Sequence, residues 1–311
     1  MKYLDVDGVR ISAIGLGTWQ FGSREWGYGP EYAARVAPAL VRRALELGIT
    51  LIDSAEAYAF GESERIVGRS LAAAGPELAD GAFVATKLMP ILPIPSVIAS
   101  RAASSRDRLG VAAIDLYQLH WPNPLVPSRT QAAGLRRVLD AGIARHVGVS
   151  NYGLGRWRAI ERALGRPVLS NQVRFSLASP SPHWELVPYA AERDRLVIAY
   201  SPLAQGLLAA GDPAGWRTGT RRMNPLLRDA SRRRARPLIA AVGEIAAAHG
   251  ATPAQVALAW VISHPNSAAI PGARTLEQLE QNAAAADLVL DPDELARLTR
   301  EAERFDAARR L

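Results

Sequence analysis

The sequence predicts a closed barrel of eight parallel strands with helices on the outside. Short apolar runs alternate with amphipathic segments along nearly the whole chain, the order typical of parallel α/β folds. The runs are apolar on both faces, as expected for strands covered on both sides. A length of 311 residues suits such a barrel, which needs about 250 residues plus insertions. We therefore interpret residues 1–311 as one domain, a (β/α)8 TIM barrel with a short N-terminal β-hairpin and an extra C-terminal helix.

The elements can be assigned in order. Residues 3–12 alternate apolar and polar around Asp7-Gly8, a strong hairpin signal. The eight strand candidates are residues 13–17, 49–53, 82–87, 114–119, 144–150, 168–173, 196–200 and 267–270. Helices are expected at 36–47, 62–73, 96–109, 129–141, 155–163, 183–193, 236–249, 253–264 and 275–285. A last helix over 293–304 should begin after Asp291, an N-cap acid followed by Pro292 and, at the third helical position, Glu294.

An open doubly wound sheet is the main alternative fold. Against it, the first strand leads into Gly15-Leu-Gly-Thr-Trp-Gln20, with glutamine where a dinucleotide fingerprint needs its third glycine. The longest irregular stretches, 22–33 and 204–236, follow the first and seventh strands. In a barrel both leave from the carboxyl ends of the strands, where active sites are built.

Composition excludes several classes of function. The chain has no cysteine, which excludes disulfides, thiolate zinc sites and cysteine nucleophiles, and we assign no metal ligand. The net charge of +7 is dispersed apart from the stretch 217–236, which matches no nucleic-acid module, so a small phosphate-bearing ligand is expected instead. The early acids at the N-terminus and the lack of a long apolar window predict a cytoplasmic protein without a membrane span. We further expect a monomer or weak oligomer.

Lysine is nearly absent from the chain, which draws attention to Lys87. Of the 37 lysines and arginines, Lys2 and Lys87 alone are lysine, and Lys87 ends an apolar run. The alternative explanation is that the composition simply favours arginine and that the two lysines have no special role. However, a compact ammonium cannot be exchanged for a guanidinium where it must tune the pKa of a neighbouring group. We therefore expect titratable partners at other strand ends.

Three further reactive groups follow the neighbouring strands. Asp53 ends the second strand, Tyr58 lies in its loop, and His120 ends the fourth. In a barrel these groups and Lys87 converge on one mouth. We expect the ammonium to lower the pKa of the Tyr58 phenol, Asp53 to be the counter-ion, and His120 to orient a carbonyl oxygen. Such a site can protonate an alkoxide, but two electrons must come from a cofactor as hydride.

A series of ordered motifs resembles the aldo-keto reductase family. Segment 48–64, with Asp53 and Tyr58, resembles the family's acid and tyrosine segment. In family order and spacing follow Thr86-Lys87, Leu119-His-Trp-Pro122, Gly148-Val-Ser-Asn151, Asn171-Gln172, Tyr200-Ser-Pro-Leu203 and Ile270-Pro-Gly-Ala-Arg274. The resemblance covers nearly the whole chain. It implies NADPH-dependent reduction of an aldehyde or ketone by a catalytic tetrad of Asp53, Tyr58, Lys87 and His120, with Tyr58 as general acid.

The resemblance also implies where NADPH or NADP+ binds. Ser150, Asn151 and Gln172 would hold the nicotinamide carboxamide, and Tyr200 would stack on the nicotinamide face. Arg274 would contact the 2′-phosphate and so favour NADPH over NADH. The full set of implied cofactor residues is Thr18, Trp19, Asp53, Ser150, Asn151, Gln172, Tyr200, Ser201, Leu203, Gly206, Gly272, Arg274, Gln278, Gln281 and Asn282.

The chain departs from the family at two positions on the cofactor side. The usual lysine over the pyrophosphate is missing from residues 207–212, and Arg221 or Arg222 is the candidate replacement. Gln281 stands where relatives often carry glutamate against the adenine amine, and its carbonyl can accept the same hydrogen bond. Thr275 and Gln278 also match a capping box, which would serve only to start a helix.

The substrate side is expected to be lined by aromatic residues. Trp19, Trp26, Tyr58, His120 and Trp121 suit a carbonyl compound with flat or apolar bulk. Two other classes of function stay open. One is a non-catalytic NADPH-binding regulatory or sensor subunit of the same fold, and the other is a barrel hydrolase or lyase with Asp53 and Glu56 as paired acids.

Overall fold

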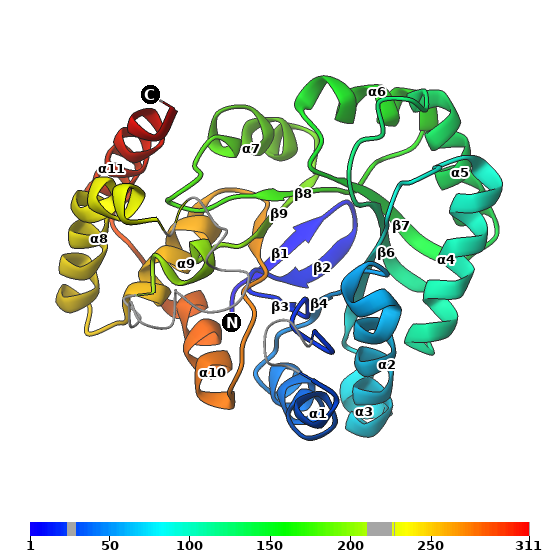
Figure 1. Ribbon diagram of the computed structural model, residues 1–311, viewed down its shortest axis with the longest axis horizontal. Helices are drawn as coiled ribbons and strands as arrows, with labels where there is room; N and C mark the ends of the chain where they lie inside the picture. The colour runs from blue at the N-terminus through cyan, green and yellow to red at the C-terminus, as the bar shows by residue number, and fades with distance from the viewer. Residues whose placement is uncertain (24–28, 210–225, 227, 311) are drawn as a thin grey trace.

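Eight parallel strands form the centre of the molecule, in a computed structural model that describes residues 1–23, 29–209, 226 and 228–310 (Figure 1). Neighbours in the chain are neighbours in the sheet. The strands are β3 (Leu16–Gly17), β4 (Leu51–Asp53), β5 (Phe83–Leu88), β6 (Ile114–Leu119), β7 (Ala144–Ser150), β8 (Ser170–Arg174), β9 (Leu196–Tyr200) and β10 (Ser267–Ala269). A parallel bridge between Ile14 and Ala269 joins the two ends of the sheet. The predicted barrel is confirmed.

Helices surround the strands as predicted (Figure 1). They are α1 (Pro30–Glu46), α2 (Glu62–Ala74), α3 (Pro76–Ala79), α4 (Pro95–Leu109), α5 (Ser128–Asp140), α6 (Leu154–Leu164), α7 (Pro182–Glu192), α8 (Asp229–Ala248), α9 (Pro253–Ser263), α10 (Leu276–Ala284) and α11 (Pro292–Arg310), with short 3-10 turns η2 (Tyr58–Gly61), η3 (Ala204–Gly206) and η7 (Ala285–Asp287). The C-terminal helix α11 packs beside α8, outside the eightfold repeat. Asp291 and Glu294 form the expected reciprocal cap at its start.

Helices α1 and α8 begin earlier than the sequence suggested. The expected starts, 36 and 236, put Pro38 and Pro237 in the first turn, yet both prolines lie inside their helices. A proline removes one intrahelical hydrogen bond, and packing of the turn upstream can compensate for that loss. Ala33 and Ala235, both upstream of the prolines, are buried. Tertiary packing therefore extends each helix past its proline.

The predicted hairpin closes the amino end of the barrel. β1 (Tyr3–Val6) and β2 (Val9–Ser12) pair antiparallel across Asp7 and Gly8, which both have positive φ. The hairpin contacts the barrel at the starts of its strands: the hydroxyl of Tyr3 donates to the carbonyl of Gly48, just before β4. With one end closed in this way, a ligand can enter from the carboxyl end.

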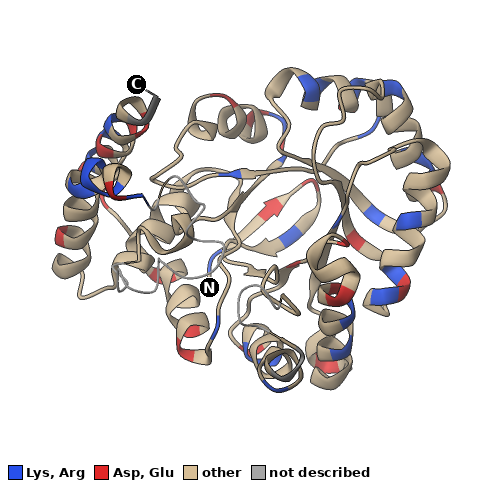
Figure 2. Cartoon of the chain, viewed as in Figure 1, with Lys and Arg blue, Asp and Glu red and all other residues tan. Residues whose placement is uncertain are grey.

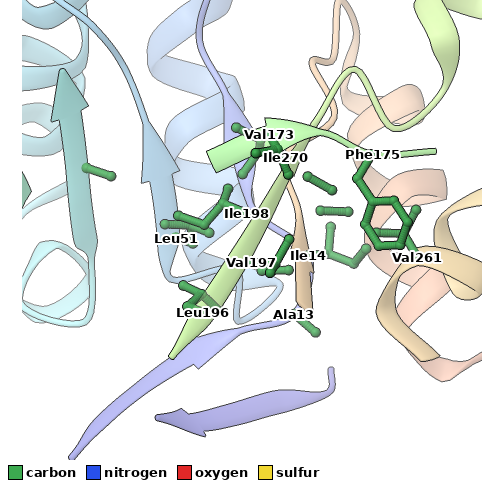
Figure 3. Packing of buried hydrophobic residues seen from close by; sticks show 14 of the residues in the cluster. Ala13, Ile14, Leu51, Val173, Phe175, Leu196, Val197, Ile198, Val261 and Ile270 are labelled. Atoms are coloured by element: carbon green, nitrogen blue, oxygen red, sulfur yellow. The ribbon is translucent and has the colours of Figure 1, made fainter. Parts of the chain in front are cut away.

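Apolar packing fills the barrel and its helical coat. Figure 3 shows Leu51 beside Ile198 on one face of β9, and Val197 with Ile14 on the other face. Alternating side chains thus serve both layers, as in any strand covered on both sides. Most charged residues lie on the outer helices, where the two signs are interspersed (Figure 2). Among the described helices, none by itself has the length and apolar composition of a membrane span; α8 and α9 meet that test when taken together across a 97° bend.

The close approach of α2 to the end of α4 depends on a glycine. A Cβ at Gly68 would overlap the backbone carbonyl of Leu109, which cannot move aside as a side chain could. We expect Gly68→Ala to lower the free energy of unfolding by about 1–3 kcal/mol, as overpacking does. Urea denaturation would measure the loss. The control is Gly243→Ala in α8, where a Cβ meets nothing within 4 Å and helix propensity predicts a gain of about 0.5–1 kcal/mol.

Candidate active site

The strand register places Asp53 and Lys87 on the inner face of the barrel. Asp53 pairs with Ala85 across β4 and β5, so their side chains share a face, and Lys87 lies two residues further along β5 on that same face. Lys87 in turn pairs with Gln118 of β6. Neither Asp53 nor Lys87 is accessible to solvent beyond 1% of its surface. The two charges are therefore buried side by side at the carboxyl end of the barrel.

Lys87 is the centre of the polar contacts at this end. Its Nζ donates to Asp53 Oδ2 at 2.6 Å, to the carbonyl of Ser54 at 2.6 Å and to Tyr58 Oη at 3.3 Å. Asp53 Oδ1 accepts a further hydrogen bond from Gln172 Nε2 at 2.7 Å. The ammonium thus has three acceptors in fixed directions, and Tyr58 is one of them. The structure brings together the acid, the ammonium and the phenol that the sequence singled out.

Burial and Lys87 act in opposite directions on Tyr58. Burial raises the pKa of the phenol, while the Lys87 ammonium lowers it, and the rise is the larger effect. The expectation that Lys87 would bring the pKa of Tyr58 below its usual value is therefore wrong for the free protein, although the direction of the Lys87 contribution is as expected. Burial also acts to lower the pKa of Lys87, but Asp53 and then Tyr58 raise it further than burial lowers it, so the amine stays protonated.

His120 is a neutral imidazole next to the phenol. Its ring meets the Tyr58 ring edge to face, with the centroids 5.8 Å apart. The Trp121 ring stacks on the His120 ring, with the centroids 3.8 Å apart. Burial, with a smaller effect from Lys87, lowers the pKa of His120 to about 2. A neutral ring carries one N–H, so His120 can donate a hydrogen bond to a ligand oxygen without bringing in a charge.

A cavity of ≈ 1170 Å³ opens over these residues. Every cofactor residue implied by the sequence lines it, and so do four of the substrate residues: Trp19, Tyr58, His120 and Trp121. Lys87 lies directly behind this surface, against Tyr58. Trp26, Arg221 and Arg222 fall outside the described residues. The cavity is large enough for a dinucleotide together with a small substrate.

Amide and hydroxyl groups from β7, β8 and β9 form one wall of the cavity. Ser150 pairs with Gln172 in register, and its hydroxyl donates to the Gln172 carbonyl at 2.8 Å. Asn151 adopts a left-handed conformation, φ 61°, and its Oδ1 accepts from the hydroxyl of Tyr200 at 2.9 Å. Such conformations are strained in residues other than glycine and concentrate at functional sites. These groups suit a planar carboxamide.

The loops after β9 and β10 also line the cavity. Ser201 and Gln205 also have positive φ and line the cavity near η3. Gly272 lines the cavity beside Gln20, whose side-chain amide lies 2.9 Å from where a Cβ at Gly272 would be. Arg274 lies on the cavity surface just before α10. A helix N-terminus with an exposed cation beside it suits a phosphate group.

One of the two hydrogen bonds of the capping box expected at Thr275 forms, and the other is shifted by one residue. Thr275 Oγ1 accepts from the backbone N–H of Gln278, while Gln278 Oε1 accepts from the N–H of Arg274, one residue before the position a capping box requires. Gln278 therefore fixes the backbone of Arg274 as well as starting the helix. A capping box with both hydrogen bonds is present at Thr252 and Gln255, at the start of α9.

Glu56 does not act as a second acid in this site. Its carboxylate accepts from the Nε of Arg101 at 2.9 Å and from the backbone N–H of Met89, and it is not among the residues lining the cavity. Asp53 is already bound to Lys87 and Gln172. The structure therefore gives no support to a hydrolase with paired acids.

Sequence reasoning missed several residues that line the cavity. Arg174 ends β8, one residue beyond the expected strand, so the rule that sites lie at strand ends would have found it. Gln205 lies between the implied residues Leu203 and Gly206. The helix at 253–264 was expected, but its first residues, which line the cavity, were not assigned to the site. The residues missed are Gly17, Gln20, Ala57, Arg174, Gln205, Ala209, Thr252, Pro253, Ala254, Ile270 and Pro271.

Comparison with known families agrees with this geometry. Residues 13–303 match the sequence profile described as the Aldo/keto reductase family. The chain belongs to this family. It is therefore an oxidoreductase that depends on a nicotinamide cofactor.

Relatives of known sequence support the same class. This aldo-keto reductase is 52% identical over 309 residues to an uncharacterized oxidoreductase of Mycobacterium tuberculosis, covering 98% of this chain and 94% of that protein. It is 35% identical to the methylglyoxal reductase YeaE of Escherichia coli, covering 93% and 90% of the two chains.

Solved structures of the family resemble this one closely. An aldo/keto reductase from Klebsiella pneumoniae in complex with NADP and acetate has a TM-score of 0.78 and 31% identity, with 96% of this chain and 94% of that chain covered. The glycerol dehydrogenase of Gluconobacter oxydans has a TM-score of 0.85 and 27% identity, with 97% and 95% covered. Reduction of carbonyl groups with a nicotinamide cofactor is the chemistry common to this aldo-keto reductase and its family.

Proposed function

We propose that this protein reduces an aldehyde or ketone to an alcohol with NADPH, and that Tyr58 is the general acid. The observation that carries the proposal is the contact of Tyr58 Oη with the buried Lys87 ammonium at the floor of a dinucleotide-sized cavity. When bound, the reduced nicotinamide supplies the hydride. Such an enzyme is expected in the cytoplasm, acting without a nucleic-acid or membrane partner, as a monomer or weak oligomer.

The protein's own groups manage the proton and the carbonyl oxygen. Tyr58 donates its hydroxyl proton to the oxygen as negative charge develops there, and Lys87 stabilises the phenolate that remains. Asp53 holds the ammonium through its 2.6 Å ion pair. The neutral His120 donates a hydrogen bond that orients the oxygen toward Tyr58. The groups are held in position before substrate arrives, so little reorganisation is needed during the reaction.

A non-catalytic sensor would need the cavity but not this arrangement of charges. A buried ion pair contributes little to stability compared with apolar packing, so its retention at the cavity floor favours a catalytic role. The test measures oxidation of NADPH in the presence of 4-nitrobenzaldehyde. The loss of absorbance of the reduced cofactor reports the rate. Turnover equal to that of a Tyr58→Phe variant would favour the sensor, and turnover without any nicotinamide requirement would favour a hydrolase.

The 2′-phosphate role proposed for Arg274 can be tested by binding alone. We expect Arg274→Ala to weaken NADPH binding by about ten- to a hundredfold, because a charge-assisted hydrogen bond is lost. Binding of NADH, which lacks that phosphate, should stay unchanged. Quenching of tryptophan fluorescence during cofactor titration measures the dissociation constants of NADPH and NADH. Arg300→Ala, on α11 and away from the cavity, is the matched control; equal weakening for the two cofactors would refute the assignment.

A further inference from the structure

Two buried carboxylates lie on either side of Tyr58 in the chain. Glu56 precedes the tyrosine by two residues, and Glu64 follows it by six. Both are buried, Glu64 completely. Neither is among the residues that line the cavity. The two carboxylates therefore lie behind the candidate site, where they can affect the reaction only through the side chains and strands that they contact.

Each carboxylate joins the segment that carries the phenol to one side of Lys87 on β5. Glu64 Oε1 accepts from the hydroxyl of Thr86 at 2.5 Å. Glu56 accepts from the backbone N–H of Met89, and its own N–H donates to the carbonyl of Lys87 at 3.2 Å. The strand is thus linked to the phenol segment immediately before and shortly after the lysine.

Two arginines of α4 hold these carboxylates from outside. Arg101 Nη2 lies 2.7 Å from Glu56 Oε1, and Arg108 Nε lies 2.6 Å from Glu64 Oε2. The arginines are about two helical turns apart, so they project from the same face of α4. We call the four side chains of Glu56, Glu64, Arg101 and Arg108 the arginine clamp. It connects α4, β5 and the segment that carries the phenol.

The turn that follows Tyr58 needs such support. Ala59 and Phe60 have left-handed conformations, with φ 47° and 55°. Residues other than glycine keep such strained conformations only where their surroundings hold them. The Phe60 side chain is 97% exposed, so its ring does not hold the turn. Arg108 does contact it, because its Nε lies 2.7 Å from the position that a Cβ of Gly61 would take.

We propose that the arginine clamp consists of positioning residues that set the 3.3 Å contact between Tyr58 Oη and Lys87 Nζ. This inference rests on the proposed function, because it assumes that Tyr58 is the general acid. Lys87 is already fixed by Asp53 and the Ser54 carbonyl, so the phenol, next to a strained turn, is the group that can shift. A displacement of about 1 Å would break its hydrogen bond to the ammonium and can cost about a hundredfold in rate.

The first test removes one ion pair of the clamp. The variant Glu64→Leu/Arg108→Met leaves no buried charge without a partner, so it is expected to fold. With NADPH saturating and 4-nitrobenzaldehyde as substrate, kcat should fall about ten- to a hundredfold. NADPH affinity in fluorescence titration should stay unchanged, because neither residue lines the cavity. The matched control is Glu62→Leu/Arg69→Met, which removes an ion pair of α2 whose side chains are 40% and 64% exposed; its kcat should be unchanged.

A double-mutant cycle distinguishes positioning from a general loss of structure. In the Tyr58→Phe background the Glu64→Leu/Arg108→Met change should lower the residual kcat by less than about twofold, because the group that it positions is gone. An equal fall in both backgrounds would overturn the inference. Saturating cofactor and equal amounts of folded protein, checked by circular dichroism, make the rates comparable.

Thr86→Val provides a second variant, which decides the matter if the first does not fold. It keeps both ion pairs and removes only the hydroxyl that joins Glu64 to β5. Loss of one hydrogen bond should lower kcat by about three- to tenfold. An unchanged kcat in this variant would also overturn the inference.

A structural measurement tests the clamp without any turnover. If the natural sequence reduces no aldehyde, the proposed function fails, but crystal structures of the natural sequence and of Glu64→Leu/Arg108→Met still show the position of the phenol. We expect Tyr58 Oη to lie beyond hydrogen-bond distance of Lys87 Nζ in the variant. A contact that stays at the length found in the natural sequence would refute the positioning role.

Discussion

Tyr58→Phe is expected to lower kcat for carbonyl reduction by about a hundred- to ten-thousandfold, the range typical of a lost general acid. The variant removes the proton that the alkoxide needs and leaves the cavity wall in place. NADPH affinity should therefore be unchanged. Lys87 keeps Asp53 and the Ser54 carbonyl as acceptors, so the free energy of unfolding should change by no more than about 1 kcal/mol. Steady-state kinetics, cofactor titration and urea denaturation measure the three quantities.

The pH profile of the reduction provides an independent check on the same residue. The active form of the phenol is the protonated one, so the rate is lost as pH rises through the pKa of Tyr58. Burial raises that pKa above its usual value of 10, so kcat should stay level through neutral and mildly alkaline pH. His120, with a pKa of about 2, should add no acid limb in the working range. A fall in kcat near pH 7–8, about where a strongly lowered phenol pKa would lie, would contradict the structure and favour the sequence-based expectation.

Lys87→Met is expected to destabilise the protein and to abolish turnover. The change leaves the Asp53 carboxylate buried with Gln172 as its remaining side-chain donor. Removing one partner of a buried ion pair typically costs about 3–5 kcal/mol of unfolding free energy. Urea denaturation followed by circular dichroism would measure the loss. Turnover should vanish as well, because nothing then stabilises the phenolate of Tyr58.

The double variant Asp53→Asn/Lys87→Met separates the two effects. With both charges removed, no buried charge is left unpaired, so most of the lost stability should return. Activity should not return, since the ammonium is still missing. Equal stability of the single and double variants would show that the ion pair is not what makes Lys87→Met unstable. Recovery of turnover in the double variant would remove Lys87 from the proposed mechanism.

Much of the fold and site follows from patterns that are local in the sequence. Each barrel strand is an apolar run, and the residues at strand ends, Asp53, Lys87 and His120, can be read directly because parallel strands of a barrel present their carboxyl ends together. The hairpin at Asp7-Gly8 and the cap at Asp291 depend on a few adjacent residues. Such features need no knowledge of distant partners, which is why they are confirmed.

Features that depend on distant partners could not be read in the same way. The starts of α1 and α8 depend on burial of Ala33 and Ala235, which extends each helix upstream of a proline that was expected in its first turn. The exposure of Ile91 and Leu125 could not be predicted from the sequence, because only the folded chain shows which apolar residues stay exposed. The cavity residues at the start of α9 required knowing that this helix faces the same space as β7 and β8.

The sequence by itself determined the barrel, the family and which four titratable side chains meet at its mouth, Asp53, Tyr58, Lys87 and His120. The tertiary structure alone decided how those groups affect one another: Lys87 with three acceptors, His120 held neutral, and a phenol whose pKa is raised rather than lowered. The reason is that a pKa depends on the balance between desolvation and nearby charge. The sequence supplies the charges, but the depth of burial is set by the packing of the whole barrel.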